Sequence, residues 1–358
     1  MNVMPDMDAR LARHKQFWGP KFEGEGAYFA AASPLPQFRS AQDRYAHWLD
    51  LDYRLKVASE SFEDAFFLGD AVPRIDPDFG PGFLPALLGR PYRIGGETVW
   101  FDIEPFSDAW EIYELELRKD LDYYRTFSDF TREMCERSEG RYMVGVTDPG
   151  SETDILASLY ERESLLMDMV LDPDRIKRLL SKTGEWWREI TLENERLIRG
   201  AQNYTAAWVP VINERPWGPL LSELSAMVSP AVFADIIAPS LERMSSVFEQ
   251  ILFNLDGNSY VRHLPEILKL DKLHSIEWDP NPKWGPGGAE KDFTTEESIS
   301  VIREILERGK KMVFNEIPAW QVPVILERIP RDGVFFYLEF ERLNEAEDFL
   351  ESVRRWMR

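Results

Sequence analysis

The stretch FNLDGNSYVRHL, residues 253–264, decides how we interpret the fold. It completes an apolar run at residues 251–253 that has the composition of a buried strand, and it ends that run with Asn254, Asp256 and Gly257. A polar turn then leads into a helical pattern. A strand that ends in polar residues and passes into a helix is the βα unit from which parallel sheets are built. The same unit recurs along the chain.

The recurring units predict a barrel. Short apolar runs with polar or glycine ends stand at 64–70, 141–151, 204–214, 250–257, 273–282, 310–318 and 333–341. About seven or eight such units in 358 residues favour a (β/α)8 TIM barrel over an open doubly wound sheet. No G-x-G-x-x-G or G-x-x-x-x-G-K-[ST] motif follows any of these runs, which argues against nucleotide binding. We expect residues 1–60 to form an N-terminal helical extension packed on the barrel, and residues 61–358 to form the barrel domain.

Three helices have clear boundary signals in the sequence. The stretch 172–200 begins with Asp172 as N-cap and a proline at the first helical position. The stretch 229–250 begins in the same way with Ser229. The stretch 294–309 begins with Thr294, and Glu297 three residues later completes a capping box.

Composition narrows the class of function. The net charge of −21 would repel phosphate backbones and anionic lipid headgroups, so neither nucleic acid nor a membrane is an expected partner. The single cysteine, Cys135, excludes an intrachain disulfide and a thiolate cluster. The start of the chain lacks the apolar core of a signal peptide, and no apolar run is long enough to span a bilayer. We expect a cytoplasmic protein that acts on a small molecule.

Polar residues that end the apolar runs are the candidate site residues. In a TIM barrel the carboxyl ends of the strands share one mouth, where the active site lies. The candidates are Asp70, Asp148, Glu214, Glu223, Asn254, Asp256, Asp279, Glu316 and Glu339. Any one of them could instead cap a helix or permit a turn. Taken together, carboxyls in one mouth repel each other, and they require a metal ion, a cationic substrate or a raised pKa.

Tryptophans stand near several of the same strand ends. Trp208 and Trp278 follow or close two apolar runs, and Trp100, Trp110, Trp217, Trp284 and Trp320 fall in similar places. Each could be an ordinary core residue. An aromatic wall beside carboxyls would suit a quaternary ammonium group, a sugar-like molecule or an aryl ether.

Three stretches carry a resemblance to a known family. They are GPLLSELSAMVSPAVFADIIAPSLERM at 218–244, FNLDGNSYVRHLPEILKLDKLHSIEWDP at 253–280 and FFLGDAVPRIDPDFGPGFLPALLG at 66–89. They resemble the uroporphyrinogen decarboxylase superfamily, and within it the uncharacterised branch of corrinoid-linked methyltransferase-like proteins. The resemblance runs from about residue 60 to the end of the chain, and it implies a distorted (β/α)8 barrel.

Departures from the family pattern restrict the reaction. The decarboxylases resemble one another in an N-terminal R-Q-A-G-R stretch, which residues 1–60 lack, and an acidic mouth would repel a polycarboxylate, so porphyrinogen decarboxylation is disfavoured. The zinc-dependent methyltransferases carry H-x-C where this chain has Asn254, Leu255 and Asp256, and a further cysteine where it has Glu339. Zinc–thiolate chemistry is therefore absent. A divalent metal held by oxygen ligands from Asp256 and Glu339 stays open.

The resemblance and the residues together predict a methyltransferase-like enzyme. It would move a methyl group from a small methylated ether or amine to a corrinoid carried by a partner protein. We expect catalytic roles for Asp256, Glu316 and Asn254, and substrate-binding roles for Asp70, Trp208, Glu223, Trp278, Asp279 and Glu339. The alternatives are a non-catalytic barrel that binds a small ligand and a metal-dependent lyase or hydrolase. Apolar patches on an acidic surface would allow a homodimer, although no stretch identifies the interface.

Overall fold

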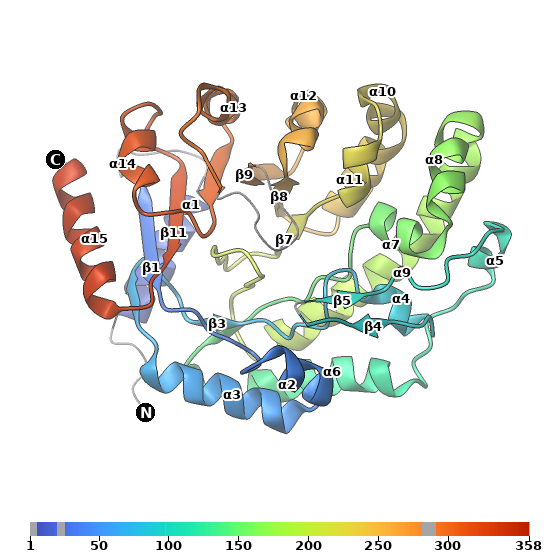
Figure 1. The fold of residues 1–358 in the computed structure, drawn as a ribbon, viewed down its shortest axis with the longest axis horizontal. Helices are drawn as coiled ribbons and strands as arrows, with labels where there is room; N and C mark the ends of the chain where they lie inside the picture. The colour runs from blue at the N-terminus through green and yellow to red at the C-terminus, as the bar shows by residue number, and fades with distance from the viewer. Residues whose placement is uncertain (1–5, 20–25, 97, 281–290, 358) are drawn as a thin grey trace.

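A mostly parallel sheet forms the centre of the molecule. The computed structural model describes residues 6–19, 26–96, 98–280 and 291–357. Seven strands lie in the order β2-β1-β11-β10-β9-β8-β7, and every neighbouring pair is parallel except β1 and β2 (Figure 1). Their bounds are β1 Tyr28–Ala32, β2 Phe67–Gly69, β7 Trp217–Leu220, β8 Gln250–Asp256, β9 Leu273–Asp279, β10 Lys311–Phe314 and β11 Val334–Glu339.

The remaining strands are short. β3 (Arg74–Ile75) pairs in parallel with β6 (Met143–Val144), and β4 (Arg93–Ile94) pairs antiparallel with β5 (Val99–Trp100). Single bridges join Gly145 to Ala206 and Thr205 to Asn213. Within the described residues, these pieces and the seven-stranded sheet do not form one continuous ladder. The architecture is therefore a mixed α/β fold that resembles a barrel, and ring closure stays a prediction.

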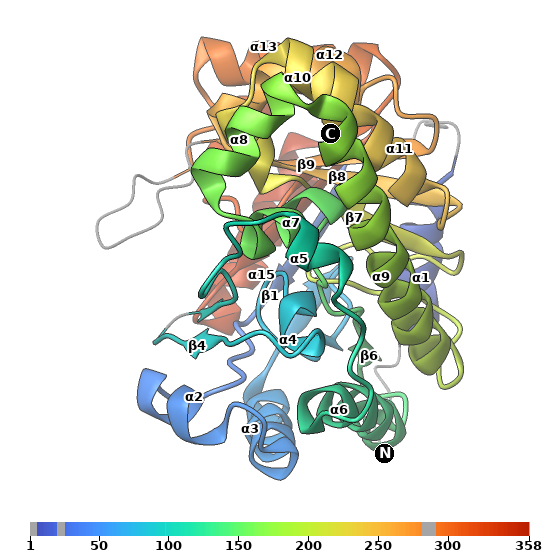
Figure 2. The same ribbon diagram turned by 90° about the vertical axis from the view of Figure 1, so that its right-hand side faces the viewer.

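Helices cover the outside of the sheet. In Figure 1, α11 to α15 follow one another around strands β7 to β11, whereas α2, α3 and α6 gather at the opposite end of the molecule in both Figure 1 and Figure 2. None of the helices in the described part of the chain is both long and apolar enough to cross a bilayer. The α-helical bounds are α1 Met7–Phe17, α2 Ala41–His47, α3 Leu51–Asp64, α4 Leu84–Leu87, α5 Trp110–Tyr113, α6 Asp122–Ser138, α7 Glu152–Leu159, α8 Arg162–Leu171, α9 Pro173–Arg199, α10 Pro230–Val232, α11 Ala238–Ser245, α12 Leu264–Ile267, α13 Glu296–Glu307, α14 Gln321–Leu326 and α15 Leu343–Trp356.

The predicted helix boundaries are partly confirmed. Asp172 caps α9 by accepting a hydrogen bond from the Arg175 backbone N–H. Ser229 also caps as predicted, but a π-helical turn at Phe233–Ile237 interrupts the helix that follows. Pro239 stands just beyond this turn, and its missing N–H removes one regular helical hydrogen bond. The cap of α13 is Thr295 and not Thr294, because the Thr295 hydroxyl accepts from the Ser298 N–H.

The first sixty residues contribute more than helices. β1 lies inside the central sheet and pairs with β11, so the expectation of a purely helical extension is wrong in this respect. All five residues of β1 are buried, so the sequence YFAAA shows no polar alternation, and its alanines are typical of helices. The domain boundary at residue 60 stays a prediction.

Helix α1 closes the amino-terminal end of the sheet. Phe17 packs edge-on against Tyr28 and Phe335, which stand at the starts of β1 and β11. The buried Lys311 ammonium, at the start of β10, donates to the Phe17 and Gly19 carbonyl oxygens. With this end filled by packed side chains, the carboxyl ends of the strands are the place for polar chemistry.

Candidate functional site

Adjacent strands β8 and β9 direct polar side chains to the same face of the sheet. In their parallel register Asn254 stands opposite Glu277, and Asp256 stands opposite Asp279. Side chains alternate between the two faces of a strand, so these four share the face of Leu252, which belongs to the interior cluster beneath them. The polar residues predicted at the ends of β8 and β9 therefore lie together. Glu277, which was not predicted, lies with them.

Glu277 is the deepest of these carboxyls. It is 3% exposed, and the Asn254 side-chain amide donates to its Oε2. Burial raises the pKa of Glu277 to about 7, while Lys291 and the Asn254 amide act in the opposite direction. Glu277 stands inside the apolar run of β9, and only its alternation with Ser275 and Asp279 could have revealed it.

Asp256 and Asp279 stand one step nearer the mouth. Burial, followed by repulsion from Asp279, raises the pKa of Asp256 to about 6. The Lys291 ammonium lies 3.0 Å from Asp279 Oδ2, but burial still raises the pKa of Asp279. Asp279 Oδ1 is buried and has no hydrogen-bond partner among the described residues. The Lys291 ammonium therefore faces several carboxyls, and nothing in the local sequence marks this lysine.

Glu316 and Glu339 extend the acidic surface across β10 and β11. Glu316 follows β10 with a φ of +54°, a left-handed conformation that is uncommon outside glycine and that marks functional sites in many proteins. Repulsion from Glu316 adds to the desolvation that raises the pKa of Glu339, and it also acts on Asp279. The Tyr337 hydroxyl donates to Glu339 Oε1 at 3.3 Å. Glu316 therefore interacts electrostatically both with Asp279 of β9 and with Glu339 of β11.

Glu223 joins the group from the loop after β7. Asp154 accepts hydrogen bonds from the backbone N–H groups of Glu223 and Leu224, which fixes the start of this loop. Desolvation and repulsion from Asp154, Asp148 and Asp256 raise the pKa of Glu223 to about 7. The structure therefore brings Asn254, Asp256, Asp279, Glu316, Glu339 and Glu223 to one end of the sheet, as the sequence predicted.

Asp70 lies elsewhere, which corrects one expectation. β2 runs antiparallel to β1, so its end returns to the amino-terminal side of the sheet. There the Asp70 carboxylate accepts from the Phe29 N–H at 2.8 Å and from Arg13 Nε at 3.0 Å. Asp70 fastens α1 to β1 and does not face the mouth. The rule that strand ends share a mouth holds only for parallel strands.

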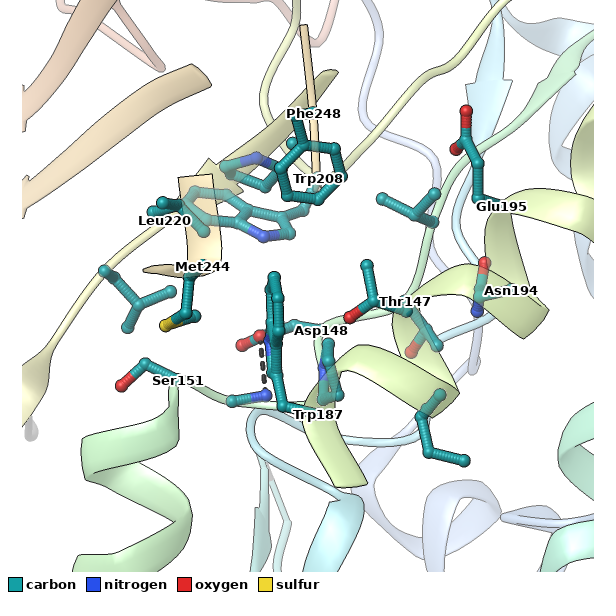
Figure 3. Close-up of a pocket in the computed structure, with 18 residues that line it drawn as sticks. Thr147, Asp148, Ser151, Trp187, Asn194, Glu195, Trp208, Leu220, Met244 and Phe248 are labelled. Atoms are coloured by element: carbon teal, nitrogen blue, oxygen red, sulfur yellow. Dashed lines mark hydrogen bonds between the residues drawn. The ribbon is translucent and has the colours of Figure 1, made fainter. Parts of the chain in front are cut away.

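The two tryptophans also separate. Trp278 is 1% exposed and packs edge-on against Phe293 on the outer, helix-facing side of β9. Its register partner Leu255 points the same way, so the expectation that Trp278 faces substrate is not met. Trp208 instead lines a cavity beside Asp148 (Figure 3).

A metal centre with oxygen ligands from Asp256 and Glu339 stays a prediction. No group of three or more histidine, cysteine, aspartate or glutamate residues in that part of the chain is arranged to hold a metal ion. Asp256 and Glu339 stand on β8 and β11, with β9 and β10 between them. The sole cysteine, Cys135, is buried in α6.

The fold and the acidic strand ends define the class: an α/β protein with a mostly parallel, barrel-like sheet and a polar site at its carboxyl edge. A solved structure of similar fold is a methyltransferase from Methanosarcina mazei, with a TM-score of 0.59 and 10% identity over 97% of this chain and 98% of that chain. At this identity the likeness shows the fold alone. No family model matches the chain, and no curated protein matches it. Membership of the uroporphyrinogen decarboxylase superfamily stays a prediction.

Proposed function

We propose that the protein is a methyltransferase-like enzyme that removes a methyl group from a small methylated ether or amine. The acceptor would be a corrinoid carried by a partner protein. One observation carries the proposal: Asp256 and Glu277 share one face of the sheet on adjacent parallel strands, and both have a raised pKa. The shared fold with a methyltransferase supports it.

The raised pKa values supply an acid where the reaction needs one. When the bond between the methyl carbon and the heteroatom breaks, the bonding electrons stay on oxygen or nitrogen, which must then gain a proton. Asp256, with a pKa of about 6, keeps part of its population protonated near neutral pH. Its proton would pass to the leaving heteroatom, and the carboxylate would regain a proton from water.

The neighbouring residues would position this acid. Asn254 holds Glu277 through its amide, and Lys291 neutralises part of the charge on Asp279. These contacts stabilise the two neighbouring carboxyls. Asp256 is then the carboxyl that can gain and lose a proton without leaving a buried charge wholly uncompensated. Glu316, Glu339 and Glu223 would favour a substrate that is neutral or cationic over an anionic one.

The methyl acceptor would have to come from outside the chain. The single cysteine of the sequence is buried in α6, so no thiolate of this protein can reach the strand ends. A corrinoid would supply a strong nucleophile for the methyl carbon when a partner presents it at the mouth. The chain's own part would be to bind the donor, hold its leaving atom near Asp256 and supply the proton.

Corrinoid dependence tests the proposal directly. Purified protein is incubated with aryl methyl ethers or methylamines, with and without reduced corrinoid, and the demethylated product and the corrinoid spectrum are followed. We expect turnover only with reduced corrinoid, and a loss of about 10²–10⁴-fold in Asp256→Asn. The matched control is Asp271→Asn, an exposed aspartate beside the opposite end of β9.

The outcomes separate the alternatives. Saturable binding without turnover under every condition would identify a binding protein and contradict the enzyme. Turnover that needs no corrinoid but stops on chelation would indicate the metal-dependent lyase or hydrolase. In the proposed reaction the rate should fall as pH rises through about 6, because the acid form of Asp256 is then lost.

A further inference from the structure

The cavity beside Trp208 and Asp148 lies at a break in the sheet, and none of the β8 and β9 carboxyls lines it. It is bounded by the stretch after β6, by β7, by the 205–213 segment that contains Trp208, and by α9 (Figure 3). The 205–213 segment makes only single bridges, so it leaves a gap beside β7 that helix α9 covers from outside. We call this space the seam cavity.

Helix α9 presents a row of polar side chains to the seam cavity. Thr191, Asn194 and Glu195 stand at helical spacing on the face that also carries Trp187. Asn194 is 2% exposed, and neither its Oδ1 nor its Nδ2 has a hydrogen-bond partner among the described residues. Thr191 Oγ1 and Glu195 Oε2 are likewise buried and unpaired there. Buried polar atoms are nearly always satisfied, so this row indicates an occupant.

The second oxygen of Glu195 is already engaged. Its Oε1 accepts from the Thr205 hydroxyl at 2.9 Å and lies 3.7 Å from Arg199 Nε. These contacts hold the carboxylate in place, and its Oε2 has no hydrogen-bond partner among the described residues. Asn194 Oδ1 and Thr191 Oγ1 are also unpaired, so this helix face carries three free oxygen acceptors, as many as an ammonium group has N–H donors.

The walls complete the recognition of a cation. Trp187, Trp208 and Phe248 enclose the space, and their ring faces attract positive charge. Asp148 also borders the cavity, so an anionic ligand would meet two carboxyl groups. Gly218 makes this wall possible, because a Cβ there would lie 2.4 Å from the ring of Phe248.

The size of the cavity limits the ligand. The centre of a water molecule can move through about 40 Å³ of it. One water needs roughly 10–15 Å³ by this measure, so the space suits about three waters or a molecule with three or four non-hydrogen atoms.

We propose that the seam cavity binds a short alkylammonium ion, with its nitrogen held by Asn194, Glu195 and Thr191 and its carbon atoms against the aromatic walls. This proposal does not rest on the proposed methyl transfer. It concerns a site that is lined by none of the carboxyls of β8 and β9.

The test compares three small probes of similar size. Ethylammonium, ethanol and acetate are titrated at constant ionic strength, and binding is followed by saturation-transfer NMR. We expect saturable binding of ethylammonium, with an affinity at least about tenfold lower in Glu195→Gln and in Asn194→Leu, because each variant removes a charge-assisted hydrogen bond. Glu185→Gln, an exposed position on the same helix, is the matched control and should bind like the wild type.

Other results would overturn the proposal. Equal binding of ethanol and ethylammonium, or binding that both cavity variants retain, would exclude this cation site. Loss of ethylammonium binding in Asp256→Asn alone would place the ion at the acidic mouth instead. Absence of saturable binding, with Asn194→Leu less stable than the wild type, would show that ordered water satisfies the polar row.

Discussion

The two halves of the barrel-like sheet differ in regularity. From β7 to β11 and on to β1, parallel strands of four to seven residues pair side by side, with one shift of register between Ile251 and Leu252. In the other half, β3 and β6 have two residues each, and the 205–213 segment is joined by single bridges. The regular half holds the acidic strand ends, whereas the irregular half holds the seam cavity. Continuous strands place side chains in register, and a break in pairing opens space between them.

Proline accounts for part of this difference. Pro73 and Pro77 flank β3, Pro149 follows β6, and Pro210 and Pro216 stand in the segment before β7. Proline cannot donate to a strand ladder, so pairing ends near each of these positions. Pro219 inside β7 is tolerated because β7 is the last strand of the seven-stranded sheet. The strands of the regular half are buried on both faces and read as apolar runs, which is typical of parallel strands.

The largest expected effect on the free energy of unfolding comes from removing a buried aromatic ring in the regular half. Phe314 is fully buried and stacks on Phe336 with ring centroids 4.6 Å apart. We expect Phe314→Ala to lower the free energy of unfolding by about 3–5 kcal/mol, measured by urea denaturation. Phe127→Ala, at a fully buried position of the irregular half, should cost about the same. A much smaller cost for Phe127 would show that the irregular half is also loosely packed.

Loss of the Asp70 carboxylate should have the next largest effect. Asp70→Ala leaves the Phe29 N–H without its acceptor and removes one partner of Arg13. We expect a loss of about 2–3 kcal/mol in the free energy of unfolding, and a smaller loss in Asp70→Asn, which keeps an acceptor oxygen. Stability unchanged in Asp70→Ala would contradict the structural role and return Asp70 to the candidate site residues.

The pH dependence of stability should reveal Glu277. Its folded-state pKa of about 7 lies above the ordinary 4.5, so the folded state binds the extra proton between these values. The contribution of Glu277 to the stability of the folded state is therefore fully present below about pH 4.5, and it is lost as pH rises through 7. Between pH 5 and 8, the free energy of unfolding of Glu277→Gln should therefore fall by about 2 kcal/mol less than that of the wild type.

A variant at an exposed glutamate serves as the control for that measurement. Glu307 is exposed at the end of α13, and Glu307→Gln should keep the wild-type pH profile of unfolding. If Glu277→Gln also keeps that profile, Glu277 does not titrate as described, and the acidic strand ends are better solvated than the structure implies.

The smallest expected effect concerns the cap of α13. Thr295→Ala removes the acceptor of the Ser298 N–H, and we expect a loss of about 1 kcal/mol by thermal unfolding. Thr294→Ala should cost less, because within the described part of the chain the Thr294 hydroxyl bonds only to the Asp292 carboxylate. The reverse order would support the capping box that the sequence predicts.

Prediction from the sequence succeeded best where structure is local. The βα rhythm, the cap of α9 and the polar ends of β8 and β9 follow from residues close together in the chain. Asp256 and Asp279 lie at the same edge because each ends a parallel strand, and the register of β8 with β9 puts them on one face. Lys291 and Glu277 were missed, because a lysine in a loop and a glutamate inside an apolar run carry no local signal of a shared site.

The sequence by itself determined that this chain alternates strands with helices and that several strands end in carboxyls. Only the tertiary structure decided that Asp70 faces the amino-terminal end, that Trp278 faces the helices and that Asn194 faces a cavity. The physical reason is that strand direction, register and the gap beside β7 depend on which distant segments pair. Local pattern fixes what a residue can do, and pairing fixes where its side chain points.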